Sequence, residues 1–372
     1  MHVSTSLWTP ARGWVPAHPA GFLADLVLYF ISPGLAANTD PWPLLSRRYA
    51  GAHVVGCTTG GEILGEEVQD DTLVAAAIRF DHATVRVAAG RVTPAESRAS
   101  GQALAANLPA EDLRLVYVLA DGMLTNGSAL IAGLRETLSE DVLLTGGLAG
   151  DGAAFCRTLV GCDGPPVQGQ VAAVGLYGKR LRLGWGSVGG WERFGPERTV
   201  TCAQANVLYE LDGEPALDLY KRYLGDEAAN LPGSALLFPL TVRPHDAPSS
   251  AVVRTVVGVD EAARSMTFAG DIPPGSIVQL MRGNFDGLVE GAAQAGERAA
   301  QGPCLALLVS CIGRKLLMGQ RIAEEVEAVA EALGPAALML GFYSYGEIAP
   351  HGFTGRCELH NQTMTVTTIG EA

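Results

Sequence analysis

Three acidic residues stand at the same place in three similar stretches of the chain. Glu62, Asp151 and Glu347 each follow a glycine at the end of a short apolar run. Glycine lets backbone amides approach a ligand closely, and a neighbouring carboxylate adds a charged acceptor. Such a pocket suits a zwitterion, for instance an amino acid, whose carboxylate needs donors and whose ammonium needs an acceptor. The alternative is that these acids cap helices or close loops.

The residues around these acids complete the predicted ligand site. They are Cys57, Thr58, Thr59 and Gly61 in the first turn, Gly150 in the second, and Tyr343, Tyr345 and Gly346 in the third. On an extended segment the two tyrosines point the same way, so they could form one side of a pocket for an apolar or cationic ligand. Ordinary core aromatics are the alternative.

Two further side chains suggest chemistry of other kinds. Cys57 could serve as a nucleophile, but no G-x-S-x-G sequence or recognisable catalytic triad accompanies it, and a buried inert thiol is favoured. In a strand, His360 shares its face with Met364 and Val366, so a buried neutral imidazole there is a candidate haem or metal ligand. A hydrogen-bonded core histidine is the commoner arrangement. The neighbouring Asn361 is included in the predicted ligand site.

A repeated unit positions the three acidic turns. Each unit has an apolar run, a loop with a helix, a second apolar run and the turn, which is typical of a βαβ crossover between parallel strands. The runs and helices lie at 26–31, 42–49 and 53–55, at 113–119, 128–138 and 142–144, and at 304–309, 320–333 and 336–340. Residues 56–63 and 341–348 also share the letters G-x-x-x-x-G-E-I, which favours duplication.

Other stretches predict antiparallel strands. We expect pairs at 72–80 with 84–88, at 171–177 with 181–185, and at 252–259 with 265–269, and a further strand region at 357–369. The predicted fold class is therefore α/β, with mixed sheets, repeated βαβ units and antiparallel additions in two related domains. The expected boundary precedes a helix capped by Asp212, with Pro215 in its first turn. It divides the chain into 1–202 and 203–372.

Composition narrows the class of protein. The chain has 372 residues, of which 48% are hydrophobic and 17% charged, so it can build a large core. A net charge of −13 without a basic block argues against nucleic acid or an anionic membrane as the main partner. Seven cysteines without a C-x-x-C pair favour a reduced, cytoplasmic location. We expect no signal peptide, and no membrane span because no uncharged apolar stretch of 18 residues escapes a Pro or Gly.

Several ordered segments together resemble the FIST family of sensory proteins, an N-terminal FIST domain followed by a C-terminal FIST domain. The resemblance rests on residues 56–63, 146–151 with Phe155 and Thr158, 206–217, 341–348 and 360–363. It implies a signal-input module for small ligands, with amino acids a proposed ligand class. Some relatives are haem proteins that sense nitric oxide and regulate a partner histidine kinase.

The first functional hypothesis is a cytoplasmic sensor that binds a small ligand and regulates a separate signalling partner. Ligand binding would bias the relative placement of the two halves of the chain. A second hypothesis is a haem-binding nitric-oxide sensor acting on a histidine kinase, with His360 as the axial ligand and Tyr343, Tyr345 or another histidine as substitutes. A third is an enzyme that uses Cys57 or the acids.

Overall fold

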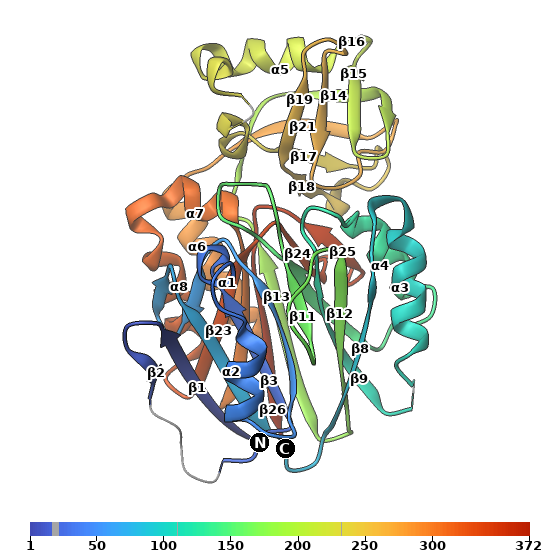
Figure 1. The fold of residues 1–372 in the computed structure, drawn as a ribbon. Coiled ribbons are helices and arrows are strands. Elements are labelled where there is room, and N and C mark those ends of the chain that lie inside the picture. The colour runs from blue at the N-terminus through green and yellow to red at the C-terminus, as the bar shows by residue number, and fades with distance from the viewer. Residues whose placement is uncertain (17–21, 110, 232) are drawn as a thin grey trace.

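The computed structural model describes residues 1–16, 22–109, 111–231 and 233–372. Three six-stranded sheets lie side by side in a core, and an eight-stranded sheet sits at one end of it, at the top of Figure 1. Parallel and antiparallel strands are mixed within the core sheets, so the predicted α/β class with mixed sheets is confirmed. Within the described part of the chain, no helix is long and apolar enough to cross a membrane.

The centre of each core sheet is a parallel pair of strands linked through a helix, as the repeats predicted. The three units are β3 (Leu26–Ile31), α2 (Pro41–Arg48) and β4 (His53–Thr58); β9 (Leu113–Ala120), α4 (Gly127–Arg135) and β10 (Leu143–Leu148); and β22 (Cys304–Cys311), α8 (Ala323–Leu333) and β23 (Ala337–Ser344). Gly56, Gly146 and Gly341 occupy equivalent positions, where a Cβ would lie about 2 Å from a carbonyl oxygen of the paired strand, at 2.1, 1.9 and 2.2 Å. The close approach explains why glycine recurs there.

Antiparallel strands extend each parallel pair. β7 (Leu73–Arg79), β1 (His2–Thr9) and β2 (Gly13–Val15) continue the first sheet; β12 (Gln170–Tyr177) and β8 (Thr84–Arg91) the second; β26 (Met364–Glu371) and β13 (Leu181–Val188) the third. Two predicted hairpins are therefore wrong. β8 does not pair with β7, which precedes it, but with β12. β13 likewise does not pair with β12 but with β26. Both connections cross between sheets, which an alternating apolar pattern cannot reveal.

The units also exchange the segments that follow their turns. β5 (Glu62–Leu64) and β6 (Glu67–Gln69), from the first unit, join β23 of the third. β24 (Gly346–Pro350) and β25 (Cys357–His360), from the third unit, join β10 of the second. β11 (Val160–Cys162), from the second unit, joins β4 of the first. This cyclic exchange holds the three turns at one place.

The eight-stranded sheet is an insertion between the second and third units. It contains β14 (Glu192–Gln204), β15 (Val207–Leu211), β16 (Glu214–Pro215), β17 (Leu240–Arg243), β18 (Val252–Arg254), β19 (Val256–Asp260), β20 (Ser265–Phe268) and β21 (Ile277–Arg282). Helix α5 (Ala216–Leu224) packs on it over a separate apolar core that includes Leu217, Leu240 and Phe268. The expected boundary at 202/203 falls within β14, and the third core sheet takes strands from both sides of it.

The remaining helices cover the core. They are α1 (Pro33–Ala36), α3 (Ser97–Ala106), α6 (Phe285–Ala299) and α7 (Ile312–Met318). Helix α5 begins three residues later than a cap at Asp212 would place it, because the Asp212 carboxylate accepts from the Thr199 amide and Arg198 instead. Asp212 therefore closes the β14–β15 connection.

Candidate functional site

The three predicted turns meet at one point in the core. The Gly60 amide donates to the Tyr343 carbonyl at 2.7 Å, the Tyr345 amide to the Leu148 carbonyl at 3.1 Å, and the Gly150 amide to the Thr58 carbonyl at 3.0 Å. These bonds form a closed ring in which each turn donates to another. A Cβ on Gly150 would lie 3.0 Å from the Gly60 nitrogen, so the turns leave no room for a ligand between their backbones.

Glu62 and Glu347 are fully buried, and each is held by its own turn. The Glu62 carboxylate accepts from the Thr59 hydroxyl and, at 2.8 Å, from the Thr72 hydroxyl. The Glu347 carboxylate accepts from the Ser344 hydroxyl at 2.6 Å and from the Thr363 amide and hydroxyl at 3.1 and 3.0 Å. Burial raises the pKa of Glu62 to about 7 and that of Glu347 to about 8. Each acid therefore links its turn to the residue that directly precedes another strand, β7 for Glu62 and β26 for Glu347.

Asp151 is displaced by one position from the other two acids. It aligns with Gly61 and Gly346 in the three turns, and its carboxylate accepts from the Cys156 and Arg157 amides at 2.8 and 2.7 Å. It also accepts from the Tyr345 hydroxyl. Asp151 therefore closes the loop after β10, and the three carboxylates do not share one hollow.

The other predicted residues of the first and third turns are divided between the core and two cavities. Cys57 is buried, and burial raises the pKa of its thiol well above the ordinary value, which opposes a nucleophilic role. Tyr343 is also buried and donates to Glu325 at 3.0 Å. Thr58 lines an open cavity of about 630 Å³ together with Asp151. Of the two tyrosines, only Tyr345 faces a cavity.

His360 is buried, as the strand pattern predicted, and its ring is within hydrogen-bond distance of a backbone carbonyl of the core. Its ring is 5% exposed, and its Nε2 is 3.0 Å from the Ala349 carbonyl oxygen. Burial lowers the pKa of His360 to about 3, so the imidazole is neutral. The described residues contain no group of three His, Cys, Asp or Glu that could hold a metal ion. Asn361 accepts from the Thr255 amide at 3.4 Å and so links the core to the inserted sheet.

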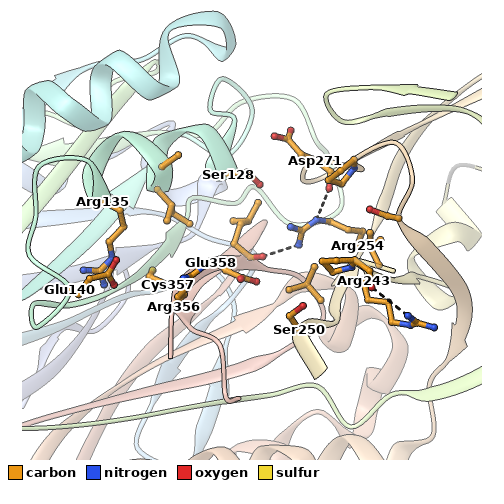
Figure 2. Close-up of a pocket in the computed structure, with 18 residues that line it drawn as sticks. Ser128, Arg135, Glu140, Arg243, Ser250, Arg254, Asp271, Arg356, Cys357 and Glu358 are labelled. Atoms are coloured by element: carbon orange, nitrogen blue, oxygen red, sulfur yellow. Dashed lines mark hydrogen bonds between the residues drawn. The ribbon is translucent and has the colours of Figure 1, made fainter. Parts of the chain in front are cut away.

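A cavity of mixed charge lies between the core and the inserted sheet. Its volume is about 600 Å³, and Figure 2 shows its lining. Helix α4 and strand β25 of the core form one side, and β17 and β18 of the inserted sheet form the other. Four guanidinium groups and three carboxylates line it: Arg135, Arg243, Arg254 and Arg356, with Glu140, Asp271 and Glu358.

Arg254 is the most deeply buried of these arginines. It is 7% exposed and lies between Asp271 and Glu358 in Figure 2. Its Nη1 donates to the Leu359 carbonyl at 2.8 Å, and its Nε donates to the Asp271 carbonyl at 3.2 Å. None of the ion pairs among the described residues includes Arg254, and its Nη2 makes no hydrogen bond there. Burial lowers the pKa of Arg254 to about 10, and the nearby carboxylates of Glu358 and Asp271 oppose that shift only in part.

The core side of the cavity also presents polar groups without partners. The Nε of Arg135 and the hydroxyl of Ser128 are buried and make no hydrogen bond within the described part of the chain. Arg356 is exposed at the rim. Arg243, by contrast, is paired with Glu197 at 2.9 Å. Unsatisfied donors of this kind favour a ligand that carries a carboxylate.

Sequence reasoning missed this cavity. Arg254 and Leu359 are separated by 105 positions in the chain. No local motif marks Asp271 or Glu358, and the opposing charges come from different sheets. The sequence held one local signal, an arginine directly after the apolar residues Val252 and Val253 of a predicted strand.

Comparisons with known proteins place the chain in a family. The FIST N domain matches residues 25–214 and the FIST C domain matches residues 216–350, so the chain belongs to the FIST family. FIST domains are sensor domains of signal transduction that are thought to bind small ligands. The family expected from the ordered segments is thus confirmed.

Individual relatives add little about activity. The uncharacterized protein MJ1623 of Methanocaldococcus jannaschii is 24% identical over 325 residues, which is 79% of this chain and 60% of that protein. The chain thus spans 60% of the length of this curated relative. Two solved structures of cyanuric acid hydrolase, one from A. caulinodans, are 11% identical over the whole chain and 99% and 98% of theirs, with TM-scores of 0.34 and 0.32.

Proposed function

We propose that this protein is a cytoplasmic sensor that binds an amino acid in the mixed-charge cavity and regulates a separate signalling protein. The observation that carries the proposal is Arg254, a buried guanidinium with a free Nη2 and no carboxylate partner among the described residues. An α-carboxylate accepting from Nη2 would neutralise that charge. The proposed ligand is still an amino acid, as expected from the sequence. Its binding groups, however, are the charged residues around Arg254 and no longer Glu62 and Glu347.

The acids of the cavity suit the other end of the ligand. Asp271 and Glu358 lie on either side of Arg254, so an ammonium group bound there can donate to one of their carboxylates. Arg243 is already paired with Glu197, but neither Arg254 nor Arg356 is in an ion pair among the described residues, so the cavity offers two guanidiniums to a ligand. A dicarboxylic amino acid can present one carboxylate to each of them. We therefore expect aspartate or glutamate to bind more tightly than neutral or basic amino acids.

Binding at this place can be read by a partner because the cavity has two independent walls. Arg135, Arg356 and Glu358 belong to the core, whereas Arg254 and Asp271 belong to the inserted sheet. A ligand that contacts both walls favours the arrangement in which both reach it, and shifts the population by its differential affinity. All seven cysteines are unpaired, and Cys156 and Cys202 are exposed, which supports a reducing compartment.

Isothermal titration with L-glutamate, L-aspartate, L-leucine, L-lysine and succinate tests the proposal. We expect glutamate or aspartate to bind, and succinate, which lacks the ammonium group, to bind more weakly. Arg356→Gln and Glu358→Gln should each weaken binding about tenfold or more, since one charged hydrogen bond contributes about 1.5–3 kcal/mol. The matched control is Arg114→Gln, which removes an exposed arginine of β9 outside the cavity.

Two results would overturn this function. One is the absence of heat and of any thermal shift with every amino acid. The other is binding that is equally tight in the parent, Arg356→Gln and Glu358→Gln. Because Arg356 is exposed, its variant separates a binding defect from a folding defect.

A further inference from the structure

A second cavity lies beside the first and has a different character. Its volume is about 520 Å³, and it is bounded by the turns of the core on one side and by the inserted sheet on the other. Leu148, Phe155 and Tyr345 line the core side, and Asn206, Thr255 and Phe268 line the inserted side. Thr255 follows Arg254 directly in the chain, so consecutive residues serve the two cavities.

The described lining of this second cavity carries no charged side chain. Its polar groups are hydroxyls and amides, and two of them have no partner. The hydroxyls of Thr255, which is 4% exposed, and Thr125 are buried without a hydrogen bond in the described part of the chain. A buried hydroxyl without a partner is costly, and a ligand that bonds to it removes the cost. The Thr255 backbone is held in place by Asn361.

An aromatic wall faces these hydroxyls from the core. The rings of Phe155 and Tyr345 are stacked, with centroids 4.6 Å apart and an interplanar angle of 16°. The Tyr345 hydroxyl is anchored by donating to the Gly152 carbonyl at 2.9 Å, and it accepts from the Phe155 amide at 3.3 Å. Phe155 adopts this position with a φ of 49°, a conformation that bulky residues rarely take. The wall is thus fixed before any ligand arrives.

We propose that this second cavity binds a small, planar, uncharged molecule that stacks near Phe155 and Tyr345 and hydrogen-bonds to Thr255. The absence of charge in the described lining excludes strong recognition of ions or zwitterions. The aromatic wall favours a flat ring, and the unpaired hydroxyls favour a ring with carbonyl or N–H groups on its edge. This site is independent of the proposed amino-acid site, and the two can be tested separately.

Thermal shift and isothermal titration with uracil, nicotinamide and indole test the second site. At least one of these probes should bind the parent, and Thr255→Val should weaken it about fivefold, the effect of one neutral hydrogen bond. The control is Thr145→Val, which also removes a buried hydroxyl without a partner but on β10, outside both cavities. Thr145→Val should bind the probe like the parent.

A rim variant makes the test independent of hydrogen bonding. Val257 is 43% exposed and lines the cavity, so Val257→Trp can fill its mouth with little cost to folding, and should abolish probe binding. Glutamate titration should be unchanged in Val257→Trp, which separates this site from the amino-acid site. The proposal is overturned if none of the three probes binds, or if binding survives both Thr255→Val and Val257→Trp.

Discussion

Arg314 and Glu325 form an ion pair that is completely shielded from solvent. The Arg314 Nε is 2.8 Å from a Glu325 carboxylate oxygen, and both side chains are 0% exposed. The other carboxylate oxygen accepts from Ser310 at 2.9 Å and from Tyr343 at 3.0 Å. The two remaining nitrogens of Arg314 donate to the carbonyls of Gly189 and Leu288.

This ion pair holds both connections of the inserted sheet. Gly189 lies between β13 and β14, where the chain enters the insertion, and Leu288 lies in α6, just after the chain returns from β21. A change in the tilt of the inserted sheet therefore acts on segments that Arg314 fixes to the core. The ion pair therefore lies at the fixed end of the insertion, and a ligand in either cavity would act on the orientation of the inserted sheet relative to this end.

Arg314→Met should destabilise the protein severely. It leaves the Glu325 carboxylate buried without its cation, a change that typically costs about 3–5 kcal/mol. Urea unfolding measures the effect, with Arg222→Met as the control because its ion pair with Glu214 is exposed and should contribute at most about 1 kcal/mol. The double variant Arg314→Met/Glu325→Leu should recover part of the loss. Equal stability of the parent and Arg314→Met would refute this account.

The buried acids of the first and third turns predict a dependence of stability on pH. The pKa values of Glu62 and Glu347 are raised to about 7 and about 8, above 4.5 for an unfolded glutamate. Between these limits the folded state binds more protons than the unfolded state, so the free energy of unfolding falls as pH rises. Each unit of raised pKa corresponds to about 1.4 kcal/mol.

Urea unfolding between about pH 6.5 and pH 8.5 measures this slope. His360 in the unfolded state has an ordinary pKa of 6.5 and still opposes the decline near that pH, so the slope is measured above about pH 7, where the unfolded imidazole is mostly neutral. Glu62→Gln/Glu347→Gln should flatten the decline, since a neutral amide does not titrate. His360 acts with the opposite sign at lower pH, where its lowered pKa of about 3 makes stability rise toward pH 6.5. A parent protein whose stability is constant over the upper range would contradict the prediction for the two acids.

The repeated units could be predicted from the sequence because their signal is local. Buried parallel strands such as β22 are continuous apolar runs, and α8 shows its buried face through Val326, Val329 and Leu333. The choice of partner strand is not local. β7 and β8 are separated by a short turn, yet β8 pairs with β12, with Arg91 opposite Gln170 and Thr84 opposite Tyr177.

The candidate site shows the same division. That the turns of Glu62 and Glu347 would lie together followed from their equivalent places after parallel strands. The sequence did not predict that the carboxylates of these two acids face inward. A local signal was present, because Thr59 and Ser344 each place a hydroxyl three residues before the acid, where the two can hydrogen-bond. Arg254 gained its role only through contact with a strand from another sheet. Charged residues that only tertiary packing brings together have no characteristic spacing in the sequence, so sequence patterns cannot predict such a site.

The ring of turn-to-turn hydrogen bonds predicts the outcome of one small substitution. A Cβ on Gly150 would lie 3.0 Å from the Gly60 nitrogen and 3.2 Å from the Tyr343 carbonyl oxygen, and both are backbone atoms that bond to each other. Gly150→Ala should therefore push two turns apart and cost about 1–3 kcal/mol in urea unfolding, as overpacking usually does. Gly90→Ala on β8 is the control, because no atom lies within 4 Å of its added Cβ, and it should be neutral or slightly stabilising. If the two alanine variants unfold at the same urea concentration, the three turns do not depend on this contact.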